Sequence, residues 1–424
     1  MATTTSPGSR SDRPPEGPLH ACLGAIIDNG YYLGKAPLFV LGAGISAKRV
    51  PFIDEMAGRL VTLIRNSTTI PKAVKAILIK HGDLIQAHRA SRSDAAEFFS
   101  TCQIPEQTMP TIWQQFCGEL ALDGLPTSDG RRFTGLFRLV PQPDTDEPAQ
   151  PLSGPSKAHL GIASLMTVGA GHVLNLNYDP LLFLAMSHLR RSSTLQNVRE
   201  MPANYHIISL HTDNDIRAYY SSTNREYQPS VINARGDIFY ARCANNRCPD
   251  FAKDRSLDTR YAMYQDDDEA FRCLSCHLKS IQLQLSFPGY ETKERLVEPI
   301  LHQLRDFLGH RVSVIVPIGL SGQWDPYLLS ELFDWSLAYS IPIVDVKPAG
   351  GTPSMPTAFE AFRHRYFPSI PVGARDEGPW YEQWASTADA FMNTLHPMVQ
   401  ATGAFKLSAL PTIPLARQAL LPLS

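Results

Sequence analysis

Short apolar runs that stop abruptly at glycine, proline or polar residues constrain the fold of this chain more than any other feature. "APLFVL" at residues 36–41 is too brief for a helix and ends at a glycine. "GHVLNLNYD" at 171–179, "RVSVIVPIGLSG" at 311–322 and "SIPIVDVKP" at 340–348 follow the same pattern. Runs of this length bounded by turn residues are typical of buried strands. We therefore expect four strands, each ending in a turn.

Segments with helical periodicity lie between these runs. "IDEMAGRLVTLIRNS" at 53–67 repeats apolar residues every three or four positions, and "LLSELFDWSLAYS" at 328–340 does the same. A largely helical stretch is expected from the first of these to about residue 120. Alternation of strand, turn and helix predicts an α/β fold, a Rossmann-like parallel sheet with helices on both faces. Ligands of such sheets bind at the carboxyl ends of the strands.

The length of 424 residues predicts two or three structural units. We expect a disordered leader at 1–18 and a sheet domain built from 19–51, 155–240 and 285–400. A helical insertion with a proline-rich loop is expected at 52–154, a small metal module at 241–284, and an apolar tail at 401–424. The tail has no assigned role.

Charge and hydropathy exclude some classes of partner. The net charge of −2 gives no bulk attraction to nucleic acid or to anionic membranes. The sequence has no apolar run near the roughly 20 residues that span a bilayer, and its first residues lack the apolar core of a secretory signal. These features predict a soluble, intracellular protein, cytoplasmic or nuclear.

Four of the seven cysteines fall into two close pairs. Cys243 and Cys248 have four residues between them, Cys273 and Cys276 have two, and 24 residues separate the pairs. Two turns that each present two thiolates are what a tetrahedral zinc site requires. We expect these four side chains to bind a structural zinc, as a small zinc ribbon. A closed four-sulfur site has no open position for water, so this metal is expected to stabilise the fold.

The motifs, taken in order, resemble those of the sirtuin (Sir2) family of NAD-consuming enzymes. "GAGIS" at 42–46 matches the glycine-rich signature of that family, and "NLNYD" at 175–179 is similar to its Thr-Gln-Asn-Ile-Asp motif. The cysteine pairs come next in the chain, and then "GLSGQWDP" at 319–326 resembles Gly-Thr-Ser-Leu-x-Val-x-Pro. Last, "VDVKP" at 344–348 resembles the strand end that carries an adenosine-binding asparagine.

The resemblance implies NAD as a co-substrate and assigns roles to individual residues. A pyrophosphate turn would comprise Gly42, Ala43, Gly44 and Ser46. Because the two glycines have no side chains, backbone N–H groups could approach the anion, and the following helix would add its positive end. Asn177 and Asp179 would line the nicotinamide–ribose pocket and take part in catalysis. Gly319 and Ser321 would contact phosphate or ribose. Asp345 would accept hydrogen bonds from the adenosine ribose, as acids at such strand ends do in dinucleotide folds.

The chain departs from the family pattern where a base is needed. Sirtuin deacylases place His-Gly eight residues before the first zinc cysteine, and this chain has Arg235 there. Arginine stays protonated and cannot accept a proton. His211 is the alternative catalytic base, because some Sir2-like NADases have a histidine at a comparable place; His206 is a weaker alternative. The arginine of the family's Gly-Ile-Pro-Asp-Phe-Arg is also absent, and Pro288 interrupts the strand that would bind acyl-lysine.

These observations support three functions. The first is cleavage of the nicotinamide–ribose bond of NAD, with transfer of ADP-ribose to water, to a protein side chain or to a small metabolite. The second is a binding protein for NAD or ADP-ribose without turnover, since the histidine is lost. The third is NAD-dependent lysine deacylation, the usual activity of the family.

Overall fold

The computed structural model describes the chain in separate stretches. The longer ones are residues 33–47, 52–68, 70–87, 155–179, 231–235, 240–243, 245–249, 291–320, 326–348 and 381–403. Shorter pieces lie between them, among them 209–210, 256–258, Cys273, 275–277 and 281–283.

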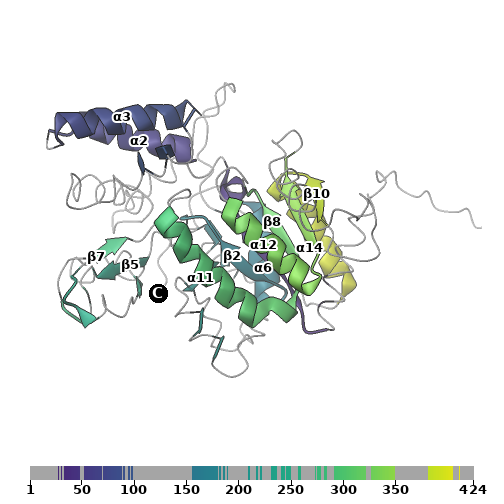
Figure 1. Ribbon diagram of the computed structural model, residues 1–424. Coiled ribbons are helices and arrows are strands. Elements are labelled where there is room, and N and C mark those ends of the chain that lie inside the picture. The colour runs from purple at the N-terminus through teal and green to yellow at the C-terminus, as the bar shows by residue number, and fades with distance from the viewer. Residues whose placement is uncertain are drawn as a thin grey trace, which may run out of the picture.

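A parallel sheet forms the centre of the described structure (Figure 1). Its seven strands lie in the order β10-β9-β8-β1-β2-β4-β3, and all neighbours are parallel. The strands are β1 (Ala36–Leu41), β2 (His172–Asn175), β3 (Ser209–Leu210), β4 (Val231–Asn233), β8 (Val312–Ile318), β9 (Ile343–Lys347) and β10 (Tyr381–Ala385). The predicted strands in 36–41, 171–179, 311–322 and 340–348 are therefore confirmed.

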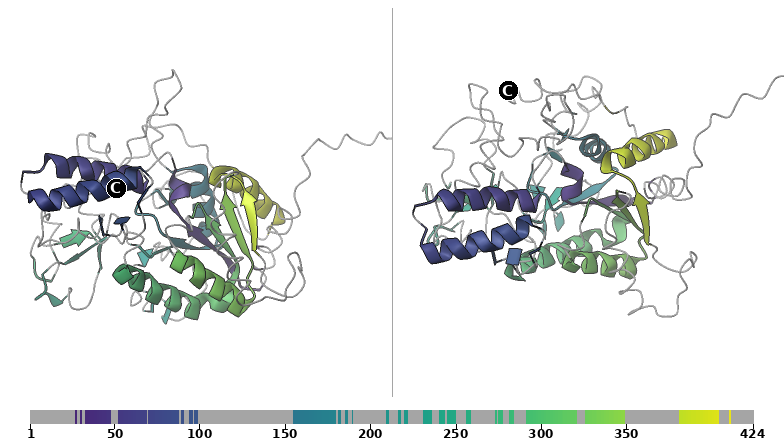
Figure 2. Two further views of the ribbon diagram at one scale, coloured as in Figure 1. Left: turned by 45° about the horizontal axis from the view of Figure 1, so that its top comes forward. Right: turned by 90° about the horizontal axis from the view of Figure 1, so that it is seen from above.

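Helices cover both faces of this sheet, as predicted (Figure 2). On one face lie α6 (Lys157–Thr167) and α14 (Ala388–Thr402). On the other lie α11 (Glu291–Leu308) and α12 (Pro326–Tyr339), with the short turn η4 (Gly309–Arg311) leading into β8. Alternate side chains of β1 point to opposite faces of the sheet and so contribute to two helical layers. Phe39 packs with α6 and α14, whereas Leu38 and Val40 pack with α11 and α12.

Helix α14 holds α6 by two polar contacts as well as by apolar packing. The side chain of Asp389, at the start of α14, accepts a hydrogen bond from the backbone N–H of Ala158 at 2.8 Å. One turn from the end of α6, the Ser164 hydroxyl contacts His396 Nε2 at 3.0 Å. Because the first N–H groups of a helix lack partners within the helix, Asp389 satisfies one of them for α6.

Two smaller units lie at the opposite end of the molecule from α14 (Figures 1 and 2). Helices α2 (Ile53–Asn66) and α3 (Lys72–Gln86) pack against each other and confirm the helix expected at 53–67. A three-stranded antiparallel sheet has the order β6-β5-β7, with β5 at Tyr240–Cys243, β6 at Ser256–Asp258 and β7 at Ile281–Leu283. This sheet carries the cysteine quartet.

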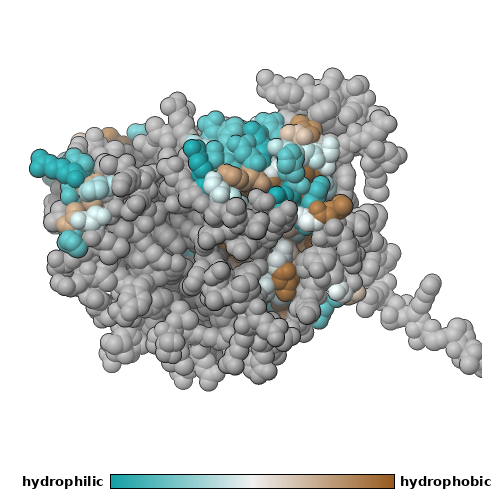
Figure 3. Space-filling model, turned by 90° about the horizontal axis from the view of Figure 1, so that it is seen from below, coloured by the Kyte–Doolittle hydropathy of each residue, from teal (hydrophilic) through white to brown (hydrophobic). Residues whose placement is uncertain are grey.

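The described surface in Figure 3 is mostly hydrophilic, with small apolar spots apart from one another. Exposed large apolar side chains come from separate elements, namely Leu33, Phe52 and Ile77. Single exposed apolar residues are normal for a folded chain. Within the stretches that the structure describes, no helix has both the length and the apolar character needed to cross a bilayer.

Candidate functional site

Three strands of the large sheet end at the same level, and their polar turns therefore meet. Leu41, the last residue of β1, is in register with Asn175 of β2 on one side and with Ile318 of β8 on the other. The hydrogen bonds continue one residue further, since Leu176 N–H donates to Leu41 O and Gly42 N–H donates to Ile318 O, both at 3.0 Å. The direction in which successive strands are added to the sheet reverses here. After β1 the chain adds β2 on one side of it, and later adds β8 on the other side. Such a reversal is a topological switch point.

The glycine turn after β1 packs backbone against backbone with the turn after β8. A Cβ atom added to Gly44 would lie 2.6 Å from the Cα of Gly319, and one added to Gly319 would lie 2.5 Å from the Cα of Gly44. Gly319 also has a φ of +64°, which disfavours residues with side chains. Glycine is therefore required at both positions by the contact itself.

Two backbone N–H groups of this turn make hydrogen bonds to the end of β8 and the turn after it. Those of Gly42 and Gly44 donate to the carbonyl oxygens of Ile318 and Gly319, at 3.0 Å each. They are engaged within the chain, so an anion at this turn would need other donors, and Ala43 is the exposed residue between the two glycines. A single 3-10 turn, η1 (Ala43–Ser46), comes directly after Gly42, and the longer helix α2 begins only at Ile53.

Ser46, Asn177 and Asp179 form one buried cluster at the switch point. The Ser46 hydroxyl donates to Asp179 Oδ2 at 2.8 Å. The Asn177 side-chain amide donates to the backbone carbonyl of Gly42 at 3.1 Å and lies 3.4 Å from Ser46 Oγ. Leu181 N–H donates to Asp179 Oδ1 at 3.0 Å. The sequence expectation that these motifs converge therefore agrees with the geometry, while their roles remain predictions.

Sequence reasoning missed a histidine that reaches this cluster from α6. His159 is 1% exposed, and its Nε2 lies 3.3 Å from Ser46 Oγ. Its Nδ1 lies 2.8 Å from the hydroxyl of Ser156, which caps the helix. The sequence signal was available: a serine three residues before a polar residue, at the start of an apolar helix, is the spacing of a capping box.

A pair of buried asparagines ties the end of β2 to the end of β4. Asn175 and Asn233 are in register, and Asn175 Nδ2 donates to Asn233 Oδ1 at 2.8 Å. The Asn175 side chain also contacts the backbone of Asn177 at 3.2 Å, accepting from its N–H and donating to its carbonyl. This network fixes the backbone around Asn177 relative to β4. Neither Asn175 nor Asn233 was singled out from the sequence.

Arg235 comes shortly after β4 and is buried close to the same cluster. Its guanidinium hydrogen-bonds the hydroxyl of Tyr178, the residue between Asn177 and Asp179. Burial raises the pKa of Tyr178 far above its ordinary value, and the nearby Arg235 charge offsets only part of that shift. The phenol is therefore neutral and the arginine charged at neutral pH.

The structure places Asp345 inside β9, not beyond its end. It is fully buried, and its Oδ2 lies 3.1 Å from Nζ of Lys347, the residue that ends the strand. A contact between Asp345 and a ribose therefore stays a prediction. His206, His211 and Ser321 lie outside the described residues, so their proposed roles also stay predictions.

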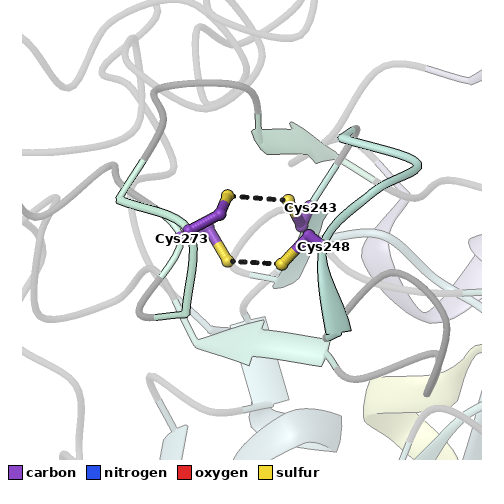
Figure 4. A group of neighbouring side chains, drawn as sticks. Cys243, Cys248 and Cys273 are labelled. Carbon is purple, nitrogen blue, oxygen red and sulfur yellow. Dashed lines mark hydrogen bonds between the residues drawn. The ribbon is translucent and has the colours of Figure 1, made fainter.

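Cys243, Cys248 and Cys273 converge as the spacing predicts (Figure 4), and Cys276 belongs to the same group. Their sulfur atoms all lie within 4.8 Å of one another, with 3.6 Å between Cys243 and Cys276 and 3.5 Å between Cys248 and Cys273. A tetrahedral zinc about 2.3 Å from each sulfur needs roughly 3.8 Å between sulfurs. Three of the four are buried. The donor set therefore fits zinc.

Comparisons with known proteins give likenesses in structure only. No protein-family model matches the chain, and no curated protein sequence matches it. Among solved structures, the chain is similar to a Sir2 homologue in complex with NAD, with 13% identity, a TM-score of 0.42, and coverage of 90% of this chain and 94% of that one. A variant Sir2 homologue bound to ADP-ribose gives 14% identity, a TM-score of 0.43, and coverage of 91% and 99%. Likenesses of this strength carry no functional conclusion by themselves.

Proposed function

We propose that this chain binds NAD at the switch point of its parallel sheet and cleaves the bond between nicotinamide and ribose, passing ADP-ribose to an acceptor. One observation carries the proposal. The glycine turn, Asn177 and Asp179 come directly after strands that end at one level, where the strand order reverses. Dinucleotides bind at such points in open α/β sheets, and the sequence motifs at these positions resemble those of NAD-consuming enzymes.

The polar cluster suits a reaction in which positive charge develops on ribose. When the glycosidic bond breaks, its electron pair leaves with nicotinamide, and the ribose carbon becomes electron-poor until an acceptor attacks it. A carboxylate held in place by two hydrogen bonds, as Asp179 is by Ser46 and Leu181, stabilises such charge without reorganisation. Asn177 is held beside it by the turn.

Arg235 limits the chemistry available after the glycosidic bond is cleaved. Deacylation requires a base for a ribose hydroxyl, and a guanidinium cannot supply one. Arg235 hydrogen-bonds Tyr178 and is charged beside the cluster. A charged guanidinium is suited to binding an anion such as phosphate and not to proton transfer. The proposal therefore favours capture by water, as in an NAD glycohydrolase, or by another acceptor. The same arginine supports a second candidate, a protein that binds NAD or ADP-ribose without turnover.

Zinc is proposed as the structural metal of the quartet. The four thiolates would complete its coordination, so no position remains for water or substrate. Its contribution is to the stability of the small sheet. The switch-point residues perform their proposed roles without it.

The test uses the full-length, zinc-loaded chain. We expect heat on titration with ADP-ribose, and nicotinamide release on incubation with NAD. Asn177→Ala should lower release at least tenfold, whereas Asn66→Ala, an exposed site at the end of α2, should not change it. Heat of ADP-ribose binding without nicotinamide release would support the second candidate, a protein that binds NAD or ADP-ribose without turnover. O-acyl-ADP-ribose formed from an acyl-lysine peptide would select deacylation. A chain that binds neither NAD nor ADP-ribose contradicts the proposal.

A further inference from the structure

The hydrogen bonds around His159 determine where its ring proton lies. The backbone N–H of Ser156 donates to His159 Nδ1 at 3.2 Å. Because an N–H can only donate, Nδ1 must present a lone pair there. The Ser156 hydroxyl contacts the same nitrogen at 2.8 Å. The ring is therefore neutral and carries its proton on Nε2.

That assignment gives a chain of hydrogen bonds with one direction of donation. His159 Nε2–H points to Ser46 Oγ at 3.3 Å, and the Ser46 hydroxyl donates to Asp179 Oδ2 at 2.8 Å. The chain starts at the first turn of α6 and ends on the carboxylate at the switch point. All of these side chains are buried, and a buried network with one consistent direction fixes each rotamer that it includes.

The order of the three groups excludes a nucleophilic serine. In a Ser-His-Asp triad, the histidine lies between the serine and the carboxylate and takes the serine proton. Here Ser46 lies between His159 and Asp179, and its hydroxyl already donates its hydrogen bond to the carboxylate instead of to a histidine. The Ser46 side chain is also 2% exposed. The arrangement orients groups and does not attack a substrate.

We propose that His159 is a positioning residue of this site. Its Nε2–H fixes the Ser46 hydroxyl, and that hydroxyl in turn sets the orientation of the Asp179 carboxylate and of the Asn177 amide. What the oriented cluster acts on rests on the proposed function, but the hydrogen-bond chain does not depend on it. In the sequence His159 belongs to none of the motifs at the strand ends.

Two measurements on the full-length chain test this inference. The first needs no nucleotide. Two-bond ¹H–¹⁵N spectra at pH 7, with His159 assigned by its loss in His159→Gln, should show a neutral ring protonated on Nε2. A ring protonated on Nδ1, or a charged ring, overturns the hydrogen-bond chain even if NAD binds.

The second measurement separates positioning from mere stability. His396 is also buried and contacts Ser164 on the same helix, so His396→Gln is the matched control. His159→Leu should weaken ADP-ribose binding and lower the kcat of nicotinamide release about tenfold, and His159→Gln, whose amide can donate to Ser46, should recover most of the loss. His396→Gln should lower the melting temperature and leave binding and kcat unchanged.

Equal effects of the His159 and His396 variants on binding and kcat, after matching for stability, overturn the positioning role. Failure of the wild-type chain to bind ADP-ribose removes the proposed function and with it the proposed effect on ligand. The tautomer of His159 then still decides whether the hydrogen-bond chain exists.

Discussion

The switch point of the large sheet and the cysteine quartet reach their geometry by opposite means. At the switch point, backbone ladders between β1, β2 and β8 bring the turns together, and side chains then hydrogen-bond across them. In the small sheet the strands are only three or four residues long, and the buried cluster formed by its described side chains consists of cysteines. The first region is ordered by folding of the chain alone. We expect the second to depend on a bound metal for its stability, because short strands around four thiols bury little apolar surface.

Removal of the metal should have the largest effect, and it should unfold the small sheet without unfolding the large one. Cys273→Ser, or a strong chelator, should abolish zinc binding and unfold the small sheet, because structural zinc contributes roughly 10 kcal/mol or more to the folding of such modules. The large sheet should stay folded. Metal analysis should find one zinc per wild-type chain, and hydrogen exchange should become fast in 240–249 but remain slow in β8. Cys22→Ser, outside the quartet, is the control. Equal loss of protection in both regions would contradict the division.

A single methyl group at the switch point should produce the next largest effect. Gly319→Ala combines a φ of +64° with a clash against the Gly44 backbone, and should destabilise the sheet by about 3 kcal/mol or more. Gly169 has a φ of +80° but nothing within 4 Å of its added Cβ, so Gly169→Ala should show the strain alone, about 1–2 kcal/mol. Urea unfolding monitored by circular dichroism measures both. Equal losses would mean that close packing at the turn contributes nothing.

Acid should weaken the large sheet through a buried histidine, with a smaller effect. Burial, and secondarily the charge of Arg311, lowers the pKa of His172 from 6.5 to about 4. Between pH 6.5 and about 4, His172 is therefore protonated in the unfolded chain but stays neutral in the folded chain. Stability from this residue is complete above pH 6.5 and should fall by roughly 3 kcal/mol on acidification to pH 4.

Urea unfolding at several pH values between 7 and 4.5 tests the effect of His172. His172→Gln should flatten the pH dependence relative to wild type, and the half-exposed His302→Gln should not. Because acid would also release the proposed zinc from its ligands, only the difference between variant and wild type is informative. An unchanged slope in His172→Gln would show that other groups govern the acid transition.

The sequence predicted best those features that depend on local pattern. The β1 run was recognised at its observed bounds, because a short apolar segment before glycine has few other solutions. The quartet was recognised because zinc requires a fixed spacing of thiolates. In both cases a local physical requirement determines the types and spacing of residues that are close together in the sequence.

Features that depend on distant contacts were missed or misplaced. His159 meets a serine 113 positions away, and nothing near it in sequence reports that contact. The hydrogen bonds from the Gly42 and Gly44 N–H groups to the carbonyl oxygens of Ile318 and Gly319 were not foreseen. Asp345 was expected at a strand end, whereas β9 continues to Lys347. Strand β10 and helix α14 were not singled out. The division into domains stays a prediction.

The cap that Asp389 places on α6 has a consequence for biosynthesis. The donor, Ala158, and the acceptor are 231 positions apart. Although Ser156 caps α6 locally, the N–H of Ala158 therefore lacks this partner on the ribosome until the last described helix has emerged. Domains generally fold as units during synthesis, so the contact between α6 and α14 can form only after α14 has been made. A chain stalled before α14 would therefore expose the apolar side chains of α6 that pack against α14, even with most of the sheet already made.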